Sequence, residues 1–168
     1  MKQEQDSFYS NILLSGHTFS ADEILLKYQY KILNTVLIVI IIFSFIFSTL
    51  SVLGLNPIGI IQTVANYILV VIAIIIIIRH RGPKERYTQC TYLMYIFSFL
   101  SFVSAFLFVS DDAFRIIWFY LLAFAAYITG GTLAGNSIII LSIIVIVLGN
   151  TFTDLHLTQK AIITSSLG

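Results

Sequence analysis

The chain has 168 residues, of which 58% are hydrophobic and 10% are charged, and its formal net charge is +1. A water-soluble domain of this length needs more polar residues to cover its surface, so the composition excludes that class and indicates an integral membrane protein. The long apolar runs lack the alternation of outer-membrane barrel strands, so we expect an all-α membrane-embedded helical bundle. The near-zero net charge gives no indication of a nucleic-acid partner.

Residues 1–31 are expected to form a cytoplasmic segment that ends in an amphipathic helix from about residue 20. Ser20 and Glu23 have the spacing of a capping box, in which each residue satisfies a backbone group of the other at a helix start. The apolar residues that follow share one broad face with two lysines nearby, as in a helix that lies on a membrane surface. These residues are Ile24, Leu25, Tyr28 and Ile32, with Lys27 and Lys31.

Residues 32–168 are expected to form a transmembrane domain with five crossings, since about 20 apolar residues span a bilayer. The predicted spans cover about residues 32–53, 58–78, 87–110, 116–128 and 136–148, of which the last two are short. Gly130 to Gly135 separates them as a tight turn or a close helix contact. An apolar segment begins again at 161–168, so we expect a sixth span that is truncated.

The basic residues predict the orientation of these spans. Arg79 to Arg86 is the densest positive run, and the positive-inside rule places it in the cytoplasm. The N-terminus then lies in the cytoplasm, and among the basic side chains only Arg115 and Lys160 lie outside.

Catalytic and metal-binding patterns are missing from the sequence. The three histidines, His17, His80 and His156, are far apart in sequence, and no glycine-rich phosphate loop is present. No serine or threonine has a nearby histidine and carboxylate to activate it. We therefore expect this chain to be no enzyme and to hold no metal and no cofactor.

The best candidate ligand site is a charged hairpin between the third and fourth spans. Asp111, Asp112 and Arg115 are too costly to bury in lipid, so they mark where the chain emerges and turns back. Trp118 follows at headgroup depth, where an indole ring is favoured, and would roof a pocket in which Arg115 pairs with an aspartate. The alternative is a solvated turn whose carboxylates point apart.

Two weaker candidate site residues are Asn66, in the second span, and His156, near Asp154. Asn66 either contacts a ligand or makes an interhelical hydrogen bond that holds packing. His156 is either an external pH or metal sensor or an ordinary surface side chain.

Three stretches resemble a known family: 19–34 before the first span, Arg79-His80-Arg81 after the second, and the acidic-x-Phe-Arg-x-x-Trp-Phe pattern at Asp112 to Phe119. Together they are similar to the multi-span input domains of bacterial diguanylate cyclases, which carry a cytoplasmic GGDEF domain downstream, and to related inputs of sensor histidine kinases. The resemblance implies a six-span bundle in the bacterial inner membrane whose last helix passes a signal to a dimeric effector. This chain has no GGDEF-like segment, so it cannot make cyclic di-GMP by itself.

We therefore expect a membrane-embedded signal-input domain that senses a small molecule or a state of the membrane and controls a cytoplasmic output. The full-length protein would be a homodimeric diguanylate cyclase, and the lipid bilayer would be a further partner. One alternative is a small transporter or channel subunit, although Asn34, Gln62, Asn66 and Asn136 are too few and dispersed to predict a path. A non-catalytic membrane assembly partner is another.

Overall fold

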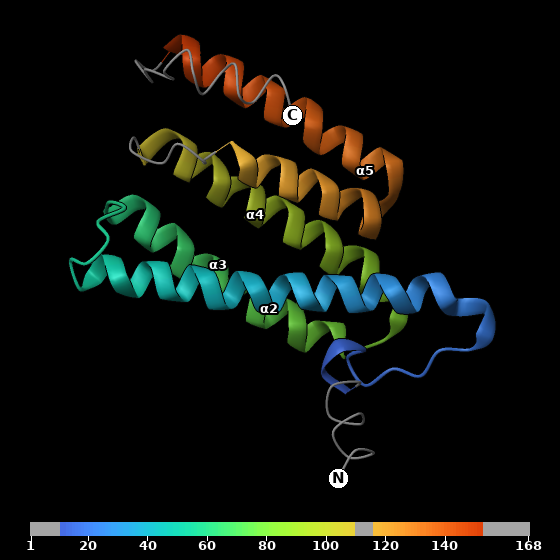
Figure 1. Cartoon of the computed structure of the whole chain (residues 1–168). Helices are drawn as coiled ribbons and strands as arrows, with labels where there is room; N and C mark the ends of the chain where they lie inside the picture. Colours follow the sequence, from blue (N-terminus) through green and yellow to red (C-terminus); the bar gives the residue numbers. More distant parts are fainter. Residues whose placement is uncertain (1–10, 110–115, 153–168) are drawn as a thin grey trace.

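The computed structural model describes residues 11–109 and 116–152, and every regular element within these ranges is a helix (Figure 1). The elements are the 3₁₀ turn η1 (Ala21–Glu23), α2 (Ile24–Val52), α3 (Ile60–His80), the 3₁₀ turn η2 (Lys84–Arg86), α4 (Tyr87–Phe108) and α5 (Ile117–Phe152). Four helices are long and apolar enough to cross a membrane. The predicted all-α fold is confirmed over these ranges, and its four long helices have the length and composition that a membrane crossing requires.

The helices pack as neighbours in chain order, and α2 also contacts α5 (Figure 1). The core contains Leu33, Leu37, Ile76, Met94 and Ala126, contributed by all four helices. Only 11% to 33% of each helix's most apolar window is buried inside the structure. Most apolar side chains therefore face outward, where lipid accommodates them and water does not.

α2 runs without a break from Ile24 to Val52, so the predicted amphipathic surface helix is not a separate element. No glycine or proline lies within this range, and a helix that has nucleated extends until something stops it. Its 29 residues give about 43 Å of helix, which exceeds the ~30 Å hydrocarbon core. The surface segment and the first span are therefore one rod.

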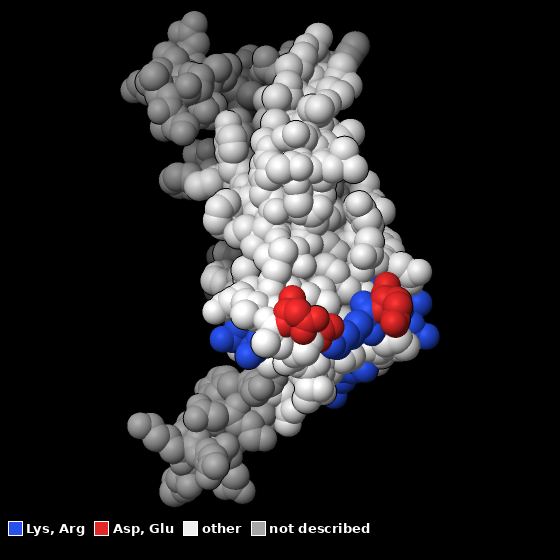
Figure 2. All heavy atoms as spheres, turned by 90° about the vertical axis from the view of Figure 1, so that its right-hand side faces the viewer, with Lys and Arg blue, Asp and Glu red and all other residues white. Residues whose placement is uncertain are grey.

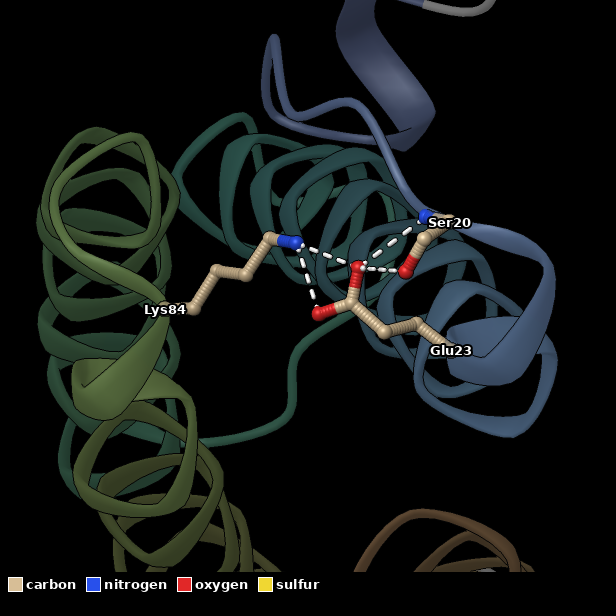
Figure 3. A network of polar contacts seen from close by, with 3 residues as sticks. All are labelled: Ser20, Glu23 and Lys84. Atoms are coloured by element: carbon tan, nitrogen blue, oxygen red, sulfur yellow. Dashed lines mark hydrogen bonds and ion pairs between the residues drawn. The ribbon is translucent and has the colours of Figure 1, made fainter.

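The start of this rod is held by the predicted capping pair and by an ion pair from the next loop (Figure 3). The Ser20 backbone N–H and hydroxyl both donate to Glu23 Oε2, each at 3.0 Å. Lys84 Nζ lies 2.8 Å from both carboxylate oxygens of Glu23 and 4.6 Å from the centre of the Phe19 ring. Lys84 thus ties the connection between α3 and α4 to the beginning of α2.

α5 folds back on itself at Gly131, where the backbone leaves helical geometry with φ 80° and ψ −173° (Figure 1). Val145 and Ile146 pack against the cluster of Phe106, Ile116 and Phe119, and in Figure 1 the second half runs back alongside the first. The interruption predicted over 130–135 is narrower than expected, because residues 132–135 are helical. By length and composition α5 counts as one membrane-crossing helix, and five crossings remain a prediction.

Charge is confined to one end of the described bundle, which we call the basic end. All six described Lys and Arg residues lie where α2 begins, where α3 ends and where α4 begins: Lys27, Lys31, Arg79, Arg81, Lys84 and Arg86. Figure 2 looks onto this end and shows Lys, Arg, Asp and Glu gathered over the lower part of the face. Residues 32–78, 87–109 and 116–152 contain no charged side chain, as a lipid-embedded region requires.

Candidate functional site

Five buried side chains at the basic end form a cluster that we call the end cluster. Ser15 comes from the segment before η1, Tyr30 and Asn34 from α2, His80 from α3 and Tyr87 from α4. Each is at most 8% exposed. Burying amide, hydroxyl and imidazole groups is costly unless they find partners, so their contacts determine how the elements fit together.

Asn34 holds the N-terminal segment and α3 against α2. Its Nδ2 donates to the backbone oxygen of Leu13 and to Ser15 Oγ, both at 2.8 Å, and to Ile12 O at 3.3 Å. Its Oδ1 lies 3.0 Å from His80 Nδ1, which also lies 3.2 Å from Ser15 Oγ. Because Nδ2 faces three oxygens, Oδ1 is the acceptor for an Nδ1–H of His80. One amide therefore fixes three elements at once.

An aromatic stack completes the end cluster. The Tyr30 ring lies flat on the His80 ring, with centroids 4.1 Å apart and planes at 10°, and Tyr87 stacks on Tyr30 at 5.0 Å. His17 Nε2 donates to His80 O at 3.1 Å, and the His17 ring meets Tyr30 edge-on. Stacked rings tolerate little rotation of the helices that carry them, so α2, α3 and α4 are in fixed register here.

Side chains from α2 and α4 also donate hydrogen bonds to the backbone carbonyl oxygens at the end of the first half of α5. Tyr87 OH donates to Thr129 O at 2.8 Å, and Gln29 Nε2 donates to Ile128 O at 3.4 Å. Tyr95 OH lies 2.5 Å from Thr129 Oγ1. Carbonyls just before a helix end lack intrahelical partners, and few water molecules reach an apolar bundle, so these donors stabilise the turn at Gly131.

Of the predicted hairpin site, Trp118 lies within the described residues. Asp111, Asp112, Arg115 and His156 lie outside the described residues. Trp118 lies on the first turn of α5, half-buried, and stacks on Phe102 of α4 with centroids 5.7 Å apart. The predicted indole is therefore part of the contact between α4 and α5.

Asn66 is buried between α3 and α4, where its Oδ1 accepts hydrogen bonds from Gln62 Nε2 at 2.8 Å and Ser101 Oγ at 3.2 Å. These contacts are those of the packing interpretation, since Ser101 joins the two helices. Asn34 lies instead in the end cluster, and Asn136 accepts a hydrogen bond from Tyr127. The four amides thus occupy three separate places.

The end cluster was not predicted from the sequence, because His80 lies within a basic run and the three histidines are far apart along the chain. His17 and His80 are in fact in contact through a backbone oxygen. No group of three potential metal-binding side chains occurs within 11–109 and 116–152. The available signal was an asparagine and a histidine at the same end of two apolar helices, where polar groups need partners.

No protein-family model, no curated protein and no solved structure matches this chain.

Proposed function

We propose that the chain is a membrane-embedded signal-input domain, with the basic end in the cytoplasm of a bacterium, and that the end cluster transmits helix movement to a cytoplasmic output domain. The observation that carries this proposal is that the contacts of the end cluster join all four helices. Its hydrogen bonds and ring stacks connect the N-terminal segment with α2, α3 and α4, and Tyr87 extends them to α5. A shift of any one helix therefore changes contacts to the others, which is what a two-state element requires.

In this proposal the two halves of α5 are separate crossings, which makes five in the bacterial inner membrane. The second half gives about 31 Å of helix and the first about 21 Å, so the first needs Ile116 and local thinning of the bilayer to span it. The turn at Gly131 would then lie on the cytoplasmic side, because Thr129 contacts Tyr87 at the start of α4. A six-span arrangement requires one more crossing after α5.

The stimulus, a small molecule or a state of the membrane, would act at the opposite end, through Asp111, Asp112, Arg115 and Trp118. The support is that Trp118 and Phe102 join α5 to α4 there. A ligand that moves α5 relative to α4 would alter the Tyr87 contact at the basic end. The output would be a homodimeric diguanylate cyclase.

The first experiment is an immunoblot of native membranes with an antibody against residues 1–19. A product well above 18.9 kDa, with mass spectrometry identifying a cyclase segment, is the expected result. A band at 18.9 kDa would contradict an attached output domain.

The second experiment introduces Asn34→Ala into the native gene and measures cellular cyclic di-GMP at equal membrane levels of the protein. The variant removes the amide that joins three elements, so we expect a several-fold change in either direction. Thr35→Ala is the matched control, because Thr35 is an exposed neighbour whose hydroxyl donates to Lys31 O within its own helix. Equal cyclic di-GMP in the wild type and Asn34→Ala would refute coupling through the end cluster.

A further inference from the structure

A groove of about 220 Å³ lies along the first turns of α2. Five α2 residues at helical spacing form one wall and floor, and Leu13 of the N-terminal segment forms the other wall. The α2 residues are Tyr28, Lys31, Ile32, Thr35 and Val36. The volume is below the ~300–1,000 Å³ of common small-molecule pockets, and the α2 residues that line the groove follow the helix over about two turns.

The lining of the groove is largely apolar, and basic side chains lie toward the start of α2. Lys31 lies at the end nearer the start of α2, and Lys27 lies one helical turn before it. Ile32 and Val36 continue the groove toward the uncharged part of the bundle. In a membrane this gradient runs from headgroup depth to the hydrocarbon core.

Both lysines are available for a ligand. Lys27 and Lys31 are exposed, and neither makes an ion pair with a residue of the described ranges. Glu23, the acidic residue one turn before Lys27, is already occupied by Lys84. Lys31 lines the groove, Lys27 lies one turn before it, and neither ammonium group has an acidic partner among residues 11–109 and 116–152.

We propose that this groove binds one anionic phospholipid, with an acyl chain along Ile32 and Val36 and the phosphate on Lys27 and Lys31. A lipid complements both features of the site, because its acyl chain matches the apolar lining and its phosphate matches the lysines. Lysine side chains reach headgroup phosphates while their methylene stems cover apolar surface. A free phosphate would leave the groove unfilled, and a neutral lipid would leave the ammonium groups uncompensated. The proposal does not depend on the signalling proposal, because it concerns lipid occupancy alone.

The test is native mass spectrometry of the purified chain released from nanodiscs of mixed phosphatidylglycerol and phosphatidylcholine. We expect retained phosphatidylglycerol in excess, and a loss of about tenfold in Lys27→Gln/Lys31→Gln, because each basic residue near an anionic headgroup adds several-fold to affinity. Arg81→Gln/Arg86→Gln is the matched control, since it removes the same charge from the same end outside the groove. An equal loss in the control, or no lipid preference in the wild type, would overturn the proposal.

A second pair of variants tests the acyl-chain part without changing charge. Thr35→Trp places an indole in the groove and should abolish retention of phosphatidylglycerol, whereas Val39→Trp, one turn deeper and outside the groove, should not. Full retention in Thr35→Trp would overturn the assignment of the groove. Retention that appears only after deletion of residues 1–10 would also overturn it, in favour of that segment as the occupant.

Discussion

Replacing Gly131 by alanine distinguishes a folded-back α5 from one continuous helix, because the two arrangements predict changes of opposite sign in the free energy of unfolding. At φ 80° and ψ −173° the backbone occupies a region nearly confined to glycine, and an alanine there costs about 1–3 kcal/mol. A Cβ at this position would meet no atom within 4 Å, so conformational strain alone sets the cost. In a continuous helix the same substitution would stabilise the protein by roughly 0.5–1 kcal/mol.

The measurement is reversible unfolding in mixed detergent and dodecyl sulfate micelles, followed by the fluorescence of Trp118. This residue is the one tryptophan of the chain, and its stacking on Phe102 reports the contact between α4 and α5. We expect the equilibrium constant for unfolding to rise roughly 5- to 150-fold in Gly131→Ala. Ser137→Ala, an exposed change within the second half of α5, should leave it nearly unchanged. A Gly131→Ala protein that is more stable than the wild type would refute the folded-back geometry.

Three further substitutions test contacts at the basic end. Asn34→Ala leaves buried partners unsatisfied and should destabilise the protein by about 1–3 kcal/mol, with faster amide hydrogen exchange over residues 11–17. Tyr95→Phe removes the hydroxyl that contacts Thr129 Oγ1 and should cost about 0.6–1 kcal/mol in the same unfolding assay. Lys84→Met removes the half-exposed ion pair with Glu23, so its small effect should be seen at low salt and vanish at high salt.

Features that depend on composition and local spacing were predictable from the sequence. Apolar runs of spanning length predicted the helices, and the Ser20–Glu23 pair predicted the start of α2. The glycine-rich stretch at residues 130–135 indicated where the chain turns. Which of them leaves the helix was not predictable, because it depends on neighbours: a Cβ on Gly130 would lie 2.7 Å from Tyr95 Oη, and one on Gly135 would overlap the Tyr127 ring.

Long-range pairing of polar groups was not predictable. Asn34 and His80 are 46 residues apart, and Ser15 and His80 are 65 residues apart. Nothing in a single sequence states which polar residue of one apolar helix faces which residue of another. That the segment expected on the membrane surface and the first span form one continuous helix was also not predictable, since a change of surface polarity does not by itself end a helix.

The hydrogen-bond donors at the Gly131 turn explain why contacts that join all four helices lie at the basic end of the bundle. A helix that ends in a water-poor region must give its last carbonyls to protein donors, and Gln29 and Tyr87 supply them from α2 and α4. Tyr87 also stacks on Tyr30, and Tyr30 stacks on His80 of α3. The side chain that donates to the end of the first half of α5 is therefore part of the same ring stack that contacts α3. A shift of α4 that changes the rotamer of Tyr87 would therefore leave the Thr129 carbonyl unsatisfied and separate the Tyr87 ring from Tyr30. These losses are coupled, and coupled losses favour two discrete packings over a continuous range of intermediates.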